Sequence, residues 1–438
     1  MLKINPLSTL YVGIDVSSKS NYVCALDFFK NNYINSSFAN NQPGAEELAL
    51  KILECLNQHP DLTMVVAALE STSVYSIHIA NYLSSCEELM RFKPYVFVLN
   101  PKCTANYKKS YIGLGKSDPI DAFVIADYAR AGNIESEPWR GSQFLALKRL
   151  TRHRIHLVEC MTREKTYLIS NLYLKFSELQ MLEGDDQPFC DIYGATSSSV
   201  LMEYLSPEEI LASSEENLIA FLAEKSRNRI KDISKTADLL KKAARDSYRL
   251  DKALYEPLNV SIASSFNCIE TFKREIKVID NAIEKEIKGL NPNAFIILQS
   301  IDGIGPVFAG GIIAEIGDIT AFHSSDALAK YAGLTWKSNQ SGDFDGEDTP
   351  MIKAGNRYLR YYLGEVANSM RKHNVEYGAY YRKKYNEVPK HQHKRALALT
   401  SRKFVRLVYG LLARNQLYSG VSLDTSIKDS NWSNLCFA

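Results

Sequence analysis

Four carboxylates in the first third of the chain are spaced so that they could act together. Asp15 lies in the apolar run YVGIDVSSKS, and Glu70 ends the run MVVAALE. Asp118 and Asp121 are three residues apart in KSDPIDA, so a helix would place both on one face. Converging carboxylates repel one another unless they share metal ions, and hard divalent cations prefer oxygen ligands. The set therefore indicates a divalent-cation site that could act on a phosphodiester.

Each acid alone also has a structural interpretation. Asp118, followed by Pro119 and with Asp121 three residues on, suits the first turn of a helix. Asp15 could begin a hairpin turn, and Glu70 could cap the next helix through the sequence ESTS. For any single acid the structural role is the better interpretation, whereas the ordered placement of all four favours the cation site.

A second candidate for chemistry is a serine in the loop sequence YAGLTWKSNQSGDFDG. Ser341 precedes Gly342 in its middle, and Ser338 lies close by. A serine in such a polar stretch is ordinarily a solvated loop residue. The eight histidines are dispersed along the chain, so a Ser-His-Asp hydrolase is not indicated. The hydroxyl could still attack a phosphodiester if metal ions or basic residues activate it.

Two features of the second half are typical of nucleic-acid binding. Gly303 and Gly305 in IDGIGPVFAGGII fit a helix-hairpin-helix, in which backbone amides approach a phosphate, although a tight turn in a packed core is the alternative. Residues 351–417 have a helical, basic pattern with interleaved tyrosines, as in NRYLRYYL and YGAYYRKKY. Cations neutralise phosphates and aromatic rings stack on unpaired bases, although a charged run is more often only a solvated face. The leading candidates for phosphate contacts are Lys353, Arg357, Arg360, Lys383, Lys384, Arg402 and Lys403.

The elements that would hold the four acids are strands and helices in alternation. The runs TLYVGIDVS, NYVCALDFF and NYINSSFA have the pattern of neighbouring strands, and LTMVVAALE and YVFVLN have the pattern of two more. Helices are predicted at about 44–56, in VYSIHIANYLSS and in SDPIDAFVIADYARAG. We therefore predict an α/β domain over residues 1–135, with a mixed sheet flanked by helices.

The middle of the chain has the pattern of long helices. The segment 143–179 carries one heptad-like apolar stripe, and a second stripe lies at 276–287. These helices could pair within one chain or with those of another subunit. We predict a helical, coiled-coil oligomerisation region over 136–290, a mostly helical C-terminal domain over 291–420 and a flexible tail over 421–438. The stripes consist of Leu147, Leu150, Leu157, Met161, Leu168 and Leu172, and of Ile276, Ile279, Ile283 and Ile287.

Composition limits the class of protein. The 438 residues allow two or three domains, and a net charge of +2 means that any nucleic-acid surface must be local. No apolar run of 18 residues is present, and the start MLKINPLSTL lacks the apolar region of a signal peptide, so we expect no membrane partner. Eight cysteines without a CxxC pair favour reduced thiols in a cytoplasmic protein over zinc or disulfides.

The segments GIDVSSKS, ALEST, KSDPIDA, SIDGIGPVFAGGIIAEIGD, YAGLTWKSNQSG and KAGNRYLRYYL resemble, in this order, those of the IS110/IS116/IS902 family of transposases. The resemblance extends to about Tyr418. It implies an N-terminal RuvC-like (RNase H-like) domain with a DEDD carboxylate set, followed by a coiled coil and a C-terminal transposase domain. By this resemblance the DEDD set is Asp15, Glu70, Asp118 and Asp121, as catalytic ligands of Mg²⁺ or Mn²⁺.

The resemblance also assigns the remaining roles. It makes Ser341 the nucleophile, while Ser338 stays a second candidate because the flanks of the loop differ from the commonest family sequence. Family members are recombinases that a structured noncoding (bridge) RNA guides to donor and target double-stranded DNA. The family implies homodimers that assemble into tetramers, with the carboxylates of one subunit facing the serine of another, at the nucleoid in a prokaryotic cytoplasm.

Two other functions stay open. One is a metal-dependent, RuvC-like junction endonuclease that cuts by attack of water and needs no serine. The other is a non-catalytic scaffold for nucleic acids, in which the acids only cap turns.

Overall fold

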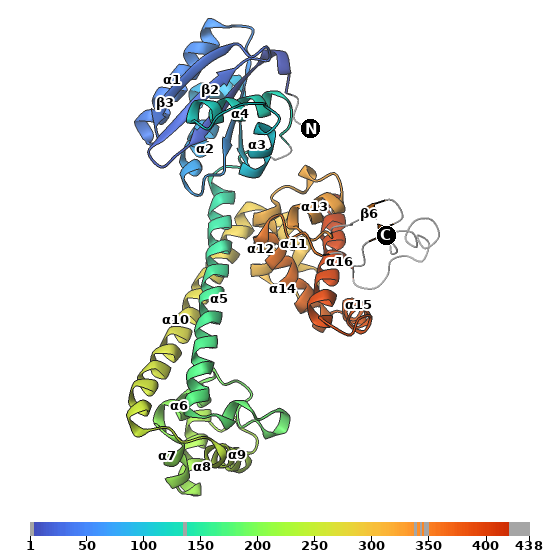
Figure 1. Ribbon diagram of the computed structural model, residues 1–438. Helices are drawn as coiled ribbons and strands as arrows, with labels where there is room; N and C mark the ends of the chain where they lie inside the picture. Colours follow the sequence, from blue (N-terminus) through green and yellow to red (C-terminus); the bar gives the residue numbers. More distant parts are fainter. Residues whose placement is uncertain (1–3, 135–137, 337–339, 342–343, 346–349, 420–438) are drawn as a thin grey trace, which may run out of the picture. The chain divides into compact units, whose positions relative to one another are not determined.

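The structure is a computed structural model that describes residues 4–134, 138–336, 340–341, 344–345 and 350–419 (Figure 1). The chain divides into two compact units. The first unit comprises residues 1–148, 290–304 and 312–438, and the second comprises residues 149–289 and 305–311.

The N-terminal strands form one mixed sheet in the order β3-β2-β1-β4-β5. The central strand β1 pairs with β2 in antiparallel and with β4 in parallel orientation, while β3 and β5 lie at the edges. The apolar runs predicted as strands all form strands, and the predicted mixed sheet is confirmed. The bounds are β1 (Thr9–Val16), β2 (Ser20–Leu26), β3 (Asn32–Ala39), β4 (Met64–Glu70) and β5 (Tyr95–Leu99).

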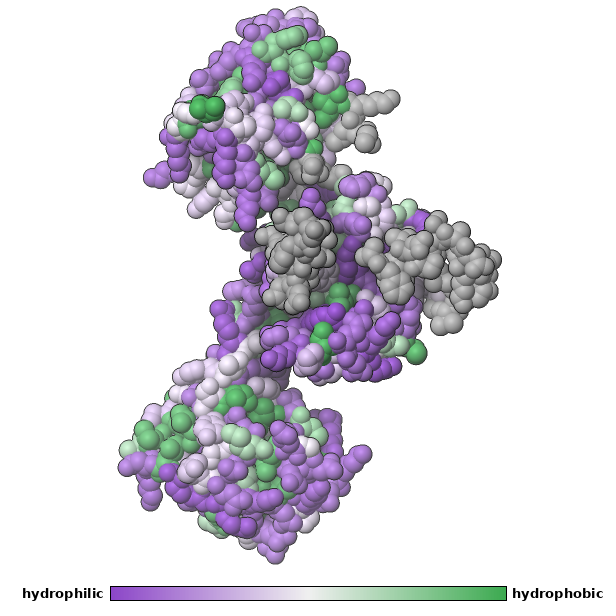
Figure 2. All heavy atoms as spheres, turned by 45° about the vertical axis from the view of Figure 1, so that its right-hand side comes forward, coloured by the Kyte–Doolittle hydropathy of each residue, from purple (hydrophilic) through white to green (hydrophobic). Residues whose placement is uncertain are grey.

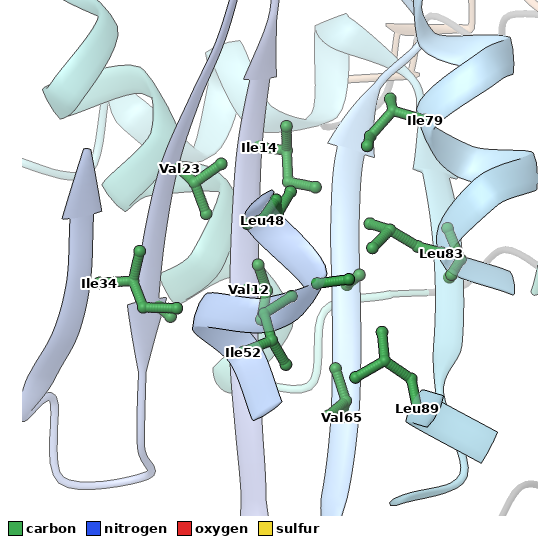
Figure 3. Packing of buried hydrophobic residues seen from close by; sticks show 14 of the residues in the cluster. Val12, Ile14, Val23, Ile34, Leu48, Ile52, Val65, Ile79, Leu83 and Leu89 are labelled. Atoms are coloured by element: carbon green, nitrogen blue, oxygen red, sulfur yellow. The ribbon is translucent and has the colours of Figure 1, made fainter. Parts of the chain in front are cut away.

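One face of the sheet is covered by α1 (Gln42–Gln58) and α2 (Tyr75–Ser85). Side chains alternate along a strand, so every second residue of β1, such as Val12 and Ile14, points into this layer. Figure 3 shows these two side chains close to Leu48 of α1. Each such fully buried side chain stabilises the fold by about 1.5–3 kcal/mol.

The opposite face is covered by α4 (Asp118–Arg130), whose Ile125 packs with side chains of the central strands. Gly13 of β1 lies on this face. A Cβ atom at this position would lie only 2.2 Å from the carbonyl oxygen of Ala122 and 2.3 Å from the amide nitrogen of Ala126. The backbone of α4 therefore lies directly on the backbone of β1, and only glycine permits this approach.

The second unit is built on two long helices, α5 (Ser142–Lys175) and α10 (Lys252–Leu290). Arg154 of α5 forms an ion pair with Asp280 of α10, and farther along Leu168 packs in one cluster with the first half of α10. The two helices that carry the predicted stripes thus contact each other within one chain, and Figure 1 shows them side by side. The smaller helices of this unit are α6 (Ala195–Glu203), α7 (Pro207–Ala212), α8 (Glu215–Ser226) and α9 (Ile233–Asp246).

The C-terminal part is mostly helical, as predicted. Residues 350–356 are an exception, because the basic helices begin only at Arg357. No helix in the described ranges is both long and apolar enough to span a membrane. The helices are α11 (Pro292–Gln299), α12 (Pro306–Ile316), α13 (Ser325–Ala332), α14 (Arg357–His373), α15 (Val375–Asn386) and α16 (Gln392–Arg414). Short 3₁₀ turns lie at Pro6–Ser8, Glu87–Phe92, Glu178–Gln180, Gly184–Asp186 and Ile319–Ala321.

Candidate active site

Asp15 and Glu70 lie at the ends of two neighbouring parallel strands. β1 and β4 are in register up to Ile14 and Leu69, so the next residue on each strand is an acid. Ile14 and Leu69 belong to the cluster under α1 and α2, and side-chain alternation therefore directs both acids to the face of α4. The carboxyl ends of adjacent parallel strands are a frequent location for sites in α/β sheets.

Asp118 and Asp121 reach the same place from the first turn of α4. Burial raises the pKa of Asp15 from 3.8 to about 6, together with the negative charges of Asp121, Asp118 and Glu70, while Lys108 acts in the opposite direction. The other three predicted carboxylates therefore lie within electrostatic reach of Asp15, although Glu70 and the α4 acids are far from it in the sequence.

Asp15 and Glu70 do not have the turn and cap roles that were their structural alternatives, whereas Asp118 and Asp121 do lie in the first turn of α4, as their alternative predicted. The turn after β1 is closed by Ser17, whose amide and hydroxyl both donate to the carbonyl of Ser20. α4 begins after the N-cap Ser117 and α2 begins after the N-cap Val74, so the neighbouring acids are not the capping residues. Within the described residues the partly buried carboxylate of Asp15 accepts no hydrogen bond.

A helix that the sequence did not predict completes the surroundings of the acids. α3 (Pro101–Lys108) presents two polar side chains one helical turn apart. The hydroxyl of Thr104 donates to Glu70 Oε1, and the ammonium group of Lys108 donates to Asp121 Oδ1. Lys108 is thus a positive group placed directly against the carboxylates.

Behind this layer, Asp127 in the middle of α4 fixes α3 and the loop that follows it. Its carboxylate accepts hydrogen bonds from Tyr107 of α3 at 2.8 Å and from Tyr111 of the loop, and it pairs with Arg130 at 2.6 Å and with Lys30 at 3.2 Å. Burial alone would raise its pKa, but the hydrogen bonds from Tyr111, Arg130 and Tyr107 hold the pKa below the usual value. An acid in the otherwise apolar sequence FVIADYA was the available signal for this buried site.

The carboxylate set fits a hard divalent cation by charge and by ligand type. Four carboxylate groups supply the oxygens that such ions prefer. Among the charged groups that shift the pKa of Asp15, Lys108 is the positive one, and it offsets part of the negative charge. In the part of the chain that the structure describes, no three His, Cys, Asp or Glu side chains are already arranged as a metal-binding cluster. The acids therefore lie near one place, and their side chains would have to change orientation to coordinate a cation.

The serine loop forms a short hairpin in the C-terminal part. Ser341 ends β6 (Gln340–Ser341) and pairs with Phe344 at the start of β7 (Phe344–Asp345). Ser338 lies outside the described residues.

Backbone and side-chain contacts hold the base of this hairpin. Trp336 and Met351 form an antiparallel bridge across it. Nη1 of Arg360, in the first turn of α14, donates to the carbonyls of Ala332 at 2.9 Å and of Lys353 at 3.1 Å. Arg360 was a predicted phosphate contact, whereas these bonds give it a structural role.

Asn356 joins the end of the hairpin segment to the surrounding helices. Its side-chain oxygen accepts hydrogen bonds from the amides of Tyr358 and Leu359, which caps α14. Its side-chain nitrogen donates to the buried carboxylate of Glu315 at 2.7 Å, and its amide donates to the carbonyl of Tyr331. The hairpin therefore extends from a fixed base.

The remaining predicted phosphate contacts lie beside α14 or on the basic helices. Lys353, Arg357 and Lys383 are exposed. Hydrophilic residues predominate on the face of this part that Figure 2 shows. Exposed ion pairs contribute only about 0–1 kcal/mol, so a phosphate could replace their acids. Three cations form ion pairs that are partly exposed, Lys384 with Glu387, Arg402 with Asp326 and Lys403 with Glu376.

Three of the interleaved tyrosines do not form the stacking platform that the sequence suggests. Tyr362, Tyr377 and Tyr381 are 0%, 2% and 9% exposed. They lie on the buried faces of α14 and α15, so their rings are part of the core and cannot stack on bases. The alternation of tyrosine and cation thus marks amphipathic helices at these positions.

Gly303 and Gly305 lie in the turn between α11 and α12. Gly303 has a φ of +92°, a conformation that favours glycine, and its carbonyl accepts a hydrogen bond from the hydroxyl of Ser369 at 2.9 Å. A Cβ at Gly305 would meet no described atom within 4 Å. Gly303 therefore serves the turn itself, whereas the backbone at Gly305 is open to approach.

Two transposase families match separate parts of the chain. Residues 12–177 match a transposase family of the DEDD type named for IS110. Residues 296–382 match the family described as transposase IS116/IS110/IS902. The first range contains all four carboxylates, and the second contains the serine hairpin and its base.

Proteins of insertion elements are similar along much of the chain. An uncharacterized 44.8 kDa protein of insertion element IS116 from Streptomyces clavuligerus is 24% identical over 422 residues, which cover 94% of this chain and 96% of that protein. An uncharacterized 42 kDa protein of IS900 from Mycobacterium paratuberculosis is 27% identical over 312 residues, 70% of this chain and 74% of that protein. A pilin gene-inverting protein from Moraxella lacunata is 26% identical over 160 residues, 36% of this chain and 46% of that protein. Since the matches follow the order of the motifs from the carboxylate domain to the serine hairpin, the chain belongs to the IS110/IS116/IS902 family and is a DNA transposase.

Proposed function

We propose that this transposase cuts and rejoins DNA through a covalent bond between Ser341 and the strand, at a phosphate held by Asp15, Glu70, Asp118 and Asp121. The observation that carries the proposal is the gathering of three acids about Asp15, whose partly buried carboxylate accepts no hydrogen bond from the described residues. Such an arrangement is unfavourable for folding alone and suits a site that receives a cation.

In the proposed step, the oxygen of the Ser341 hydroxyl forms a bond to phosphorus, and the bond from phosphorus to one deoxyribose oxygen breaks. The serine hydroxyl loses a proton and the released deoxyribose oxygen gains one, so the number of phosphodiester bonds is unchanged. A hydroxyl of another DNA end then reverses the step, which forms a DNA phosphodiester and frees the serine. Because the ester keeps the bond energy, exchange needs no external energy source.

We propose Mg²⁺ or Mn²⁺ as the cation, since the DEDD family implies divalent metal in general. Asp15 and Glu70 on the strands and Asp118 and Asp121 on α4 would hold it. The bound ion would offset charge on the phosphate and on its attacking and leaving oxygens. The strand order and the family support assignment of this sheet to the RuvC-like (RNase H-like) fold.

We propose that donor and target double-stranded DNA and an element-encoded noncoding RNA bind the basic C-terminal helices. Base pairing would read the sequence while the protein contacts backbone. Exposed Lys353, Arg357 and Lys383 support this surface. The open backbone at Gly305 would supply a separate phosphate contact of the helix-hairpin-helix type. The similar protein named for pilin gene inversion supports rearrangement of DNA as the outcome.

We propose a homodimer that assembles into a tetramer, so that the carboxylates of one copy meet the serine of another. The helices α5 and α10 contact each other within one chain, so assembly would use the surfaces of this coiled-coil region that these contacts leave open. These interactions would take place at the nucleoid in a prokaryotic cytoplasm.

The proposal is tested with purified protein, element RNA and end-labelled donor and target DNA. A covalent adduct is detected as label that stays with the protein in denaturing gels. We expect the adduct with the unchanged protein and with Ser338→Ala, and no adduct or exchange product with Ser341→Ala. Asp15→Asn should also lose both products while its thermal unfolding and RNA binding stay intact.

The results separate the alternatives. Cleavage without an adduct, retained in Ser341→Ala, would identify the endonuclease that uses water. An adduct in Ser341→Ala that disappears in Ser338→Ala would move the nucleophile to Ser338. RNA and DNA binding without any cleavage, unaffected by Asp15→Asn or Glu70→Gln, would favour the non-catalytic scaffold.

A further inference from the structure

α3 places a lysine where the proposed cation would bind. Nζ of Lys108 contacts Asp121 Oδ1, and its charge lowers the pKa that the other acids raise at Asp15. The side chains of Lys108 and Asp121 are 22% and 28% exposed, so the contact is partly shielded from solvent. The loop Lys109–Ser117 separates α3 from α4 in the chain, and the lysine is therefore brought to Asp121 by the tertiary fold.

We propose that Lys108 is the resident counter-ion of the carboxylate set, and that a divalent cation must displace it from Asp121 in order to bind. This inference rests on the proposed function, since it assumes that the four acids hold a metal ion. It makes Lys108 a residue that sets metal affinity, and it assigns α3 to the active site.

The contacts around Lys108 allow the ammonium group to leave while α3 stays. α3 is attached to β4 by the bond from Thr104 to Glu70, and to α4 by the bond from Tyr107 to Asp127. Neither bond involves Lys108. A lysine carries its charge on a flexible four-carbon stem, so the ammonium can turn away without moving the helix.

The electrostatic consequence has a definite sign. While Lys108 is at Asp121, one carboxylate is occupied and the net charge of the set is reduced, which lowers its attraction for a second cation. Removal of the lysine charge should therefore strengthen metal binding. The pair is only partly shielded, so we expect a dissociation constant for Mn²⁺ about three to ten times lower in Lys108→Gln.

The matched pair of variants is Lys108→Gln and Lys109→Gln. Both lose one positive charge at the end of the same helix, but Lys109 is exposed and its ammonium group donates only to Asn106 in the described structure. Mn²⁺ binding to the full chain is measured by calorimetry and by electron paramagnetic resonance of the free ion, near pH 8. We expect tighter binding by Lys108→Gln, a change below about twofold for Lys109→Gln, and an unchanged constant for Lys108→Arg.

Thermal unfolding gives a second measurement, which does not depend on metal affinity when a chelator is present. In the presence of a chelator, Lys108→Gln should melt at a lower temperature than Lys109→Gln, because it leaves the acids without their counter-ion. Added Mn²⁺ should raise its melting temperature by more than it raises that of the unchanged protein.

The outcomes distinguish this inference from the proposed function. Equal or weaker Mn²⁺ binding by Lys108→Gln, with binding that is lost in Asp15→Asn, overturns the counter-ion role and leaves the metal site in place. Binding that survives in both Asp15→Asn and Glu70→Gln places the metal elsewhere and overturns both proposals. The absence of Mn²⁺ binding to the unchanged protein likewise overturns both.

Discussion

Gly13→Ala should separate α4 from β1 and disable the carboxylate set without changing any acid. Ordinary contacts of a Cβ atom begin at 3.4 Å, whereas the new atom would lie 2.2 Å from the oxygen of Ala122 and 2.3 Å from the nitrogen of Ala126. Both are backbone atoms of α4, so the helix itself must move by about 1 Å, the difference between 3.4 and 2.2 Å. Asp118 and Asp121 would move with it.

Two magnitudes follow from that shift. Overpacking of this kind costs about 1–3 kcal/mol of unfolding free energy. A displacement of about 1 Å in reacting groups can lower a rate about 100-fold. We therefore expect urea unfolding at lower denaturant concentration, and adduct formation reduced by about two orders of magnitude even where the protein is fully folded.

The control for Gly13→Ala is Gly289→Ala. Gly289 lies near the end of α10, and a Cβ there would meet no described atom within 4 Å. Alanine is preferred to glycine in a helix, so this variant should be neutral or up to about 1 kcal/mol more stable, with normal activity. An unfolding free energy of Gly13→Ala within about 0.5 kcal/mol of that of the unchanged protein, together with adduct formation at the normal rate, would contradict this prediction. In that case α4 does not lie on β1 as described.

Two further predictions concern other parts of the chain. Burial lowers the pKa of Lys175 from 10.5 to about 8, and the one described hydrogen bond of its ammonium group goes to the carbonyl of Leu201. Because the unfolded chain keeps this proton at higher pH than the folded chain does, unfolding free energy should rise by about 2 kcal/mol between about pH 7.5 and 9.5 in urea titrations. Lys175→Met should remove most of that rise, and an equal rise in the variant would show that other groups cause it. Arg360→Met should release the base of the serine hairpin. Adduct formation should then fall at least about tenfold, while DNA affinity measured by filter binding changes less than about threefold. An equal loss of both would instead make Arg360 a phosphate contact.

The strands and the position of the acids could be predicted because the information is local. β1 and β4 are apolar runs of strand length, and their acids stand at the ends, where a site in such a sheet is expected. The alternation in TLYVGIDV also predicts that Asp15 points to the opposite face of the sheet from Ile14 and Val16, which belong to the layer under α1 and α2. What local pattern cannot supply is the neighbour strand, and hence the adjacency of Asp15 to Glu70.

α3 could not be predicted from periodicity because it buries almost nothing apolar. Thr104 is its one buried residue, and most of the others are exposed. A start signal was nevertheless present in Asn100 and Pro101, which form the N-cap and the first helical position. The contact of Lys108 with Asp121 depends on how the following loop folds back, and a single sequence does not specify that path.

The tyrosines of α14 and α15 show the opposite limitation. Tyr362 and Tyr377 stand among lysines and arginines, and in sequence they resemble a surface for bases. Tyr362 lies at helical spacing from Leu359 and Val366, so it belongs to the apolar stripe of α14 that packs in the core. A count of cations therefore indicated a basic surface correctly, but it could not separate exposed rings from buried ones.

The two proposed sites for nucleic acid have opposite electrostatic requirements. The basic helices carry exposed cations that attract a phosphate backbone directly. The carboxylate set repels one, because Lys108 offsets only part of the charge of Asp15, Glu70, Asp118 and Asp121. On the proposed mechanism, DNA bound by the helices would therefore place a phosphate at the acids only after a cation has joined them. If the proposed mechanism holds, binding and chemistry are separable in this way, and the cation, rather than the affinity for DNA, would decide when a strand is exposed to the serine.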